Sequence, residues 1–120
     1  MNTYMVYLKA KPSPGSEEFG EVGGAYIHCY VQSESIADAA QKAVAFVMGR
    51  LWVVTEQIHA LLMTPERIAL MDEAENATYQ RAQLEGLHSY FLAWPINERE
   101  EDIFEIRGLK DVDKFDGSTH

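Results

Sequence analysis

The sequence predicts a single α+β domain, built from a mixed sheet of four strands with two helices on one face. One observation is a change of period: side chains alternate along residues 26–31, whereas apolar residues recur at helical spacing from Ile36 onward. Another is composition, since 120 residues that are 47% hydrophobic and 24% charged suffice for one globular core. The predicted order is strand, strand, helix, strand, helix, strand, for which a sheet with both helices on one face is the simplest packing.

The stretch Ala25–Met63 organises this prediction as strand, helix and strand. Alternation in the first strand separates two faces, of which one carries Ile27, Cys29 and Val31 and the other Tyr26, His28 and Tyr30. Ser35 followed by Asp38 resembles a capping box, and Gly49 is suited to ending the helix that begins there. Branched and aromatic residues make 51–63 a second strand, so the unit predicts a parallel pair joined by a right-handed crossover.

The remaining elements flank this unit. Residues 3–11 alternate and predict a first strand, and Pro12–Gly24 is a plain loop, because no phosphate-binding lysine follows its glycines. Residues 65–85 predict one helix, with Thr64 as its cap and Gly86 as its end. Leu87–Trp94 predicts a strand that is apolar on both faces.

This arrangement resembles a ferredoxin-like sandwich with a non-standard order of elements. The resemblance concerns architecture alone, because that fold hosts many unrelated functions. The domain is expected to span residues 1–95. Residues 96–120 carry eight acids and four bases, a local charge of 4 − 8 = −4, and form an acidic extension. Within it, 102–107 predicts a short edge strand, and the chain beyond Gly108 is expected to fray.

Charge and cysteine content bound the class of function. A net charge of −9 with a pI near 4.8 argues against direct binding of nucleic acid or of an anionic membrane. No apolar run reaches the ~20 residues that span a bilayer, and the N-terminus lacks the pattern of a signal peptide. Cys29 is the only cysteine and lies on an apolar strand face, so we expect a buried, unreactive thiol in a cytoplasmic protein.

The sheet face opposite Cys29 is the candidate binding site. If the helices cover the other face, large rings remain without a helical cover, and their parity groups Tyr26, His28, Tyr30, His59, His88 and Tyr90. Three uses of such a face compete. A homodimer interface would bury the rings, a pocket would enclose a small molecule, and a metal site would need His28, His59 and His88 to converge.

The functional prediction is a small interaction module without catalytic activity, cofactor or metal, which forms a homodimer through the helix-free face. An alternative is an acidic inhibitor or immunity-type protein, which would block a basic nucleic-acid-binding partner through Asp72, Glu73 and Glu75. A further alternative is a small enzyme or ligand-binding protein that uses His28, His59 and an inward-facing Glu56. No nucleophile and base occur at a diagnostic spacing, so no catalytic residue is assigned.

Overall fold

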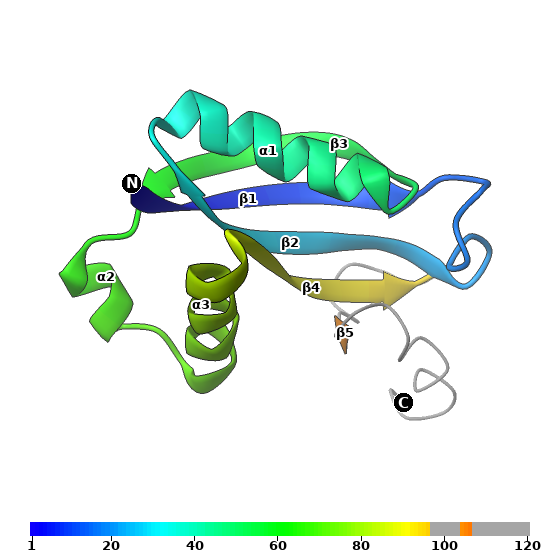
Figure 1. Ribbon diagram of the computed structural model, residues 1–120. Helices are drawn as coiled ribbons and strands as arrows, with labels where there is room; N and C mark the ends of the chain where they lie inside the picture. The colour runs from blue at the N-terminus through cyan, green and yellow to red at the C-terminus, as the bar shows by residue number, and fades with distance from the viewer. Residues whose placement is uncertain (97–103, 107–120) are drawn as a thin grey trace.

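The computed structural model describes residues 1–96 and the short strand at 104–106. One five-stranded sheet, in the order β3-β1-β2-β4-β5, forms the centre of the molecule (Figure 1). The elements in chain order are β1 (Asn2–Pro12), β2 (Val22–Ser33), α1 (Ile36–Gly49), β3 (Trp52–Leu62), α2 (Pro65–Ala69), α3 (Glu73–Glu85), β4 (Leu87–Pro95) and β5 (Phe104–Ile106). The predicted α+β class is confirmed, whereas the ferredoxin-like arrangement is not confirmed. β5 pairs with β4 at the edge of the sheet, and the fraying expected beyond Gly108 lies outside the described residues.

Every neighbouring pair of strands is antiparallel, so the prediction of a mixed sheet is wrong. β2 and β3 do run in the same direction, because both are antiparallel to β1, but β1 lies between them and they do not pair. The strand–helix–strand pattern predicts relative direction correctly. The pattern does not indicate whether a third strand lies between these two. Here β1, which forms a hairpin with β2, occupies that position.

α1 covers one face of the sheet, and the main core lies between them. Ala39, Ala43 and Val47 of the helix are fully buried against Ile27 and its neighbours on that face. The two alanines allow the helix to approach the sheet closely. Ser35 caps the helix by accepting a hydrogen bond from the Asp38 amide, as predicted. Gly49 is the residue expected to end the helix with a left-handed backbone conformation, but its φ is not positive.

The residue with a left-handed backbone conformation between α1 and β3 is Leu51, which immediately precedes β3 and has a φ of 64°. Ser13 holds the turn from the other side, since its amide and its hydroxyl both donate to the Leu51 carbonyl oxygen, at 3.0 and 2.6 Å. Glycine adopts a positive φ more readily than leucine does, so residue type alone favours Gly49 for this conformation. The two hydrogen bonds from Ser13 place Leu51 in it instead.

The predicted helix over 65–85 is two helices, and they lie on the face opposite α1 (Figure 1). Thr64 caps α2 and Gly86 ends α3, as predicted, but Asp72 interrupts the helix by capping α3 with its own capping box. The placement of two helices on one face is therefore wrong. α1 occupies the side that carries Ile27, and the partly polar inner side of α3 packs where Thr3, Tyr30 and Gln32 offer polar and aromatic groups.

The loop between β1 and β2 is ordered around a buried carboxylate. Glu18 Oε1 accepts hydrogen bonds from the Trp52 indole nitrogen at 3.0 Å and from the Ser16 hydroxyl at 2.6 Å. The expected loop extends only to residue 21, because Gly23 and Gly24 belong to β2. They lie beneath the Trp94 indole, and no side chain at Gly24 would fit there, since a Cβ would come within 2.5 Å of Trp94 Cζ2.

Candidate binding surface

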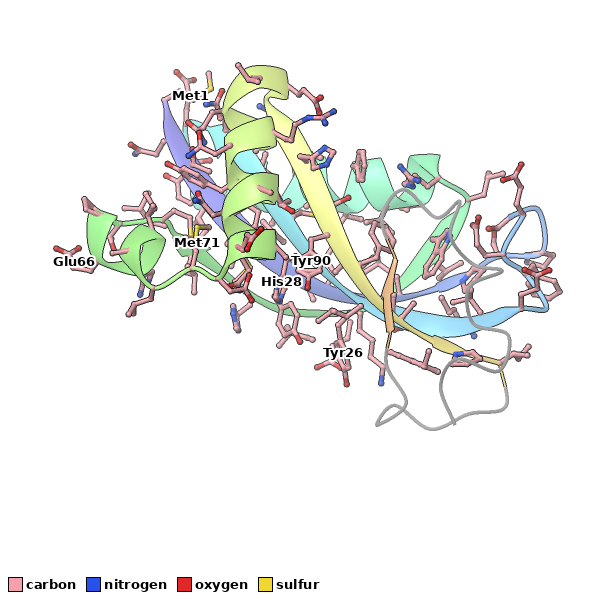
Figure 2. The ribbon with its side chains drawn as sticks, turned by 90° about the horizontal axis from the view of Figure 1, so that it is seen from below. Met1, Tyr26, His28, Glu66, Met71 and Tyr90 are labelled. Carbon is pink, nitrogen blue, oxygen red and sulfur yellow. The ribbon has the colours of Figure 1, made fainter. Side chains whose placement is uncertain are left out.

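Five partly exposed or exposed rings form a continuous surface on the part of the sheet that α3 leaves uncovered. We call this the aromatic surface, and it consists of Tyr7, Tyr26, His28, His59 and Tyr90. The pleat puts these side chains on one face, and the register puts them side by side, because Tyr7 pairs with both His28 and His59 while His28 pairs with Tyr90. Figure 2 shows His28 and Tyr90 near the end of α3, with Tyr26 further along the sheet.

Tyr7 is the centre of the aromatic surface. Its ring centroid lies 4.7 Å from that of His28, 5.4 Å from that of His59 and 5.7 Å from that of Tyr26. Tyr90 meets His28 edge to face at 5.8 Å. These separations are those of favourable aromatic pairs, so the rings hold one another in place. The five rings therefore pack against one another in a single contiguous group.

A lysine and a tryptophan border the aromatic surface at the end remote from α3. Trp94 packs against Tyr26 with centroids 5.6 Å apart, and the Lys9 ammonium nitrogen lies 5.7 Å from each of these two rings. Lys9 faces Glu56 across the β1–β3 pair, so a cation and an acid are neighbours at this border. The aromatic surface itself contains no carboxylate and no lysine or arginine.

His28 brings a buried polar atom to the aromatic surface. Its Nδ1 atom is buried and has no hydrogen-bonding partner among the residues that the structure describes. Burial lowers the pKa of His28, and the His59 charge acts in the same direction, while Glu75 and Asp72 act against both. The imidazole is therefore neutral at neutral pH. Burial also raises the pKa of the Tyr7 phenol.

Of the six predicted face residues, four belong to the aromatic surface and two do not. Tyr30 is only 2% exposed, because α3 covers it and Tyr79 meets its ring at 6.1 Å. His88 lies just after the C-terminal end of α3, where its Nδ1 is 3.1 Å from Glu85 Oε1. Within residues 1–96, no three His, Cys, Asp or Glu side chains lie close enough together to hold a metal ion.

The prediction that Glu56 faces inward is wrong. Two register shifts between β1 and β3 reverse the parity of the strand there, so Glu56 faces Lys9 and is exposed. The arrangement proposed for a small enzyme therefore lacks its buried carboxylate. Tyr7, Lys9 and Trp94 are the residues of this region that sequence reasoning missed. Tyr7 and Lys9 are two residues apart and share one face of β1, but only the strand register shows that they adjoin Tyr26.

The three acids assigned to a partner have different roles. Asp72 accepts a hydrogen bond from the Glu75 amide at 2.7 Å, and Glu75 accepts one from the Asp72 amide at 2.9 Å, so both carboxylates build the start of α3. Glu73 is exposed, and none of the described contacts ties it to another element. Cys29 is fully buried, and burial raises the pKa of its thiol to about 12, so it is not a nucleophile at neutral pH.

The chain matches no protein-family model, no curated protein and no solved structure. Among the described residues, none of the helices is long and apolar enough to cross a membrane. The chemistry of the aromatic surface therefore carries the functional proposal.

Proposed function

We propose that this protein is a non-catalytic interaction module that forms a homodimer through the aromatic surface. The observation that carries the proposal is the contiguous group of partly exposed or exposed rings on the part of the sheet that α3 leaves uncovered. Covering apolar area stabilises a complex by about 25 cal/mol per Å². Rings that are already ordered lose little entropy when a partner covers them.

The distribution of charge determines where a second copy can bind. Two chains that each carry a net charge of −9 repel, so they associate best through a region with few acids. None of the five rings is acidic, and at the border Lys9 lies across from Glu56, which allows reciprocal pairing in a two-fold dimer. Edge-to-edge pairing of β3 is less favourable, because the register shifts distort that strand.

Sedimentation equilibrium at micromolar concentration and neutral pH tests the proposal. We expect a dimer for the natural chain and a monomer for Tyr26→Asp, which places a charge within the aromatic surface. Met48→Asp is the matched control, because Met48 is 59% exposed on α1, on the other side of the sheet, and its substitution should leave the dimer intact. A natural chain that is monomeric under these conditions contradicts the proposal.

Acidification gives a second measurement of the same interface. Protonating His28 inside a dimer requires burying a charge, so the dimer should weaken as pH falls toward the lowered pKa of His28. His28→Gln removes this titrating group while keeping a polar side chain at the same position. Its dimer should lose less affinity on acidification than that of the natural chain.

A further inference from the structure

A separate apolar hollow lies between the sheet and the connection from α2 to α3. Its volume is about 280 Å³, and most of its lining is apolar. The apolar lining consists of Met5, Tyr30, Leu61, Met63, Leu70 and Met71. The hollow is open to solvent on one side, so it can take a single large side chain or a small apolar group.

The break between the helices creates this hollow. Met5 pairs with Tyr30 on one side and with Leu61 on the other, and these three residues form the floor. α2 ends at Ala69, and the chain turns through Leu70 and Met71 before Asp72 starts α3. Leu70 is left 84% exposed at the rim of the hollow. Burying such a side chain against a partner is favourable.

The methionines in the lining allow the hollow to adapt to apolar side chains of different shapes. Three of the lining side chains are methionines, which are unbranched and adapt their shape to what they bind. Surfaces of this kind accept apolar anchors from different segments, because the side chains repack around each of them. The hollow thus supplies contact area, while the charges around it determine which segment is accepted.

Those charges are predominantly acidic. Glu75 lines the hollow, Asp72 and Glu73 adjoin it at the start of α3, and Glu66 belongs to α2. Figure 2 shows Glu66 and Met71 at this end of the molecule. Arg67 is the only base in the lining, and its Nη1 donates to the Leu62 carbonyl oxygen at 2.7 Å. With the chain at a net charge of −9, the rim attracts cations.

We infer that this hollow is a docking site for a basic amphipathic segment of another protein, with one large apolar side chain in the hollow and flanking lysines or arginines against the acids. The acids around the hollow attract the lysines or arginines of such a segment, whereas they would repel a second copy of this acidic chain. The inference does not depend on the homodimer, since the aromatic surface and the hollow share no residue.

Fluorescence anisotropy with two labelled peptides tests the inference. One is an amphipathic helix of leucine and lysine with a single tryptophan anchor, and the other has glutamate in place of every lysine. At an ionic strength of about 0.15 M, which limits unspecific attraction, we expect the lysine peptide alone to bind. Failure of the lysine peptide to bind at about 100 μM protein, or equal binding of both peptides, overturns the inference.

Matched variants locate the site. Leu70→Ser should weaken binding of the lysine peptide at least about fivefold, whereas Leu84→Ser should not, although both leucines are 84% exposed. Glu73→Lys should weaken it more than Glu34→Lys, an exposed acid outside the hollow that changes the net charge equally. Equal effects within either pair contradict the assignment.

The same titration on Tyr26→Asp separates this inference from the proposed homodimer. Undiminished peptide binding by that variant shows that the hollow acts without self-association. If Leu70→Ser instead changes the sedimentation of the protein without peptide, a second copy occupies the hollow and the inference is wrong.

Discussion

Tyr79 of α3 meets Tyr30 of β2 edge to face, with ring centroids 6.1 Å apart and ring planes at 89°. Two hydrogen bonds accompany this contact, because the Gln83 amide donates to the Thr3 hydroxyl and accepts from Gln32. α3 is thus fastened to the sheet largely through an aromatic pair and a small amide network. Its buried residues, Thr78 and Ala82, are small and bury little apolar area.

Replacing Tyr79 tests this attachment. Tyr79→Ala removes the ring and should cost about 1–3 kcal/mol of unfolding free energy, since it loses an aromatic pair and the area buried with it. Amide hydrogen exchange should become faster in α3 than in α1. Tyr79→Phe keeps the ring and is the control, for which we expect a change below about 0.5 kcal/mol. Equal exchange in α3 for both variants would show that the tyrosine pair does not hold the helix.

Gly24 provides the space that Trp94 occupies. An added Cβ would lie 2.5 Å from Trp94 Cζ2 and 3.0 Å from the Ala10 carbonyl oxygen, so Gly24→Ala should destabilise the protein by about 1–3 kcal/mol in urea unfolding. Gly49→Ala is the control, because a Cβ added at this position of α1 would meet open space, and alanine favours helix there. Gly49→Ala should leave stability equal or higher.

The Glu18–Trp52 hydrogen bond stabilises the loop between β1 and β2. Glu18→Ala leaves the buried indole N–H without its acceptor, which costs about 1–3 kcal/mol. Glu18→Gln retains a carbonyl oxygen at the same place and should cost less. Urea unfolding followed by tryptophan fluorescence measures both, with the exposed Glu17→Ala as the control. A loss from Glu17→Ala as large as that from Glu18→Ala would refute the role given to this bond.

His28 makes the stability depend on pH in a defined direction. Its pKa is lower in the folded protein than in the unfolded chain, so the unfolded chain binds more protons as pH falls below about 6.5. The free energy of unfolding contributed by His28 is therefore present at neutral pH and is lost between about 6.5 and its lower folded pKa.

His28→Phe should remove this loss, which urea midpoints at about pH 7.5 and 5.5 would measure. At the higher pH the variant should be no less stable, because the replaced Nδ1 has no partner within the described residues. His59 and His88 are present in both proteins, so the difference between their pH profiles isolates His28. Identical profiles would contradict the assignment.

The core next to α1 gives a graded prediction. Leu8 is fully buried, and Leu8→Ala should cost about 2–5 kcal/mol. Phe46 is only partly buried, and the Arg50 guanidinium lies 5.6 Å from its ring centroid, so Phe46→Ala should cost less than the ~3–5 kcal/mol of a fully buried phenylalanine. Chemical denaturation orders the two variants. A larger loss from Phe46→Ala would show that its ring, and not Leu8, anchors α1.

Local patterns predicted most elements and their ends. The alternation of 26–31, the cap at Ser35, the cap at Thr64 and the end at Gly86 all depend on residues a few positions apart, and the structure confirms each. The break at Asp72 was missed although its signal is local, since Asp72 and Glu75 have the spacing of a capping box. The helical pattern from Pro65 to Glu85 concealed it.

The sequence by itself determined the α+β class and the separation of an apolar strand face from an aromatic one, because period two and period 3.6 arise from neighbouring residues. Only the tertiary structure decided that β1 lies between β2 and β3, that α3 covers Tyr30, and that Glu56 faces Lys9. Each of these depends on contacts between residues far apart in the chain. Their free energies are set by packing and register, which local periodicity does not contain.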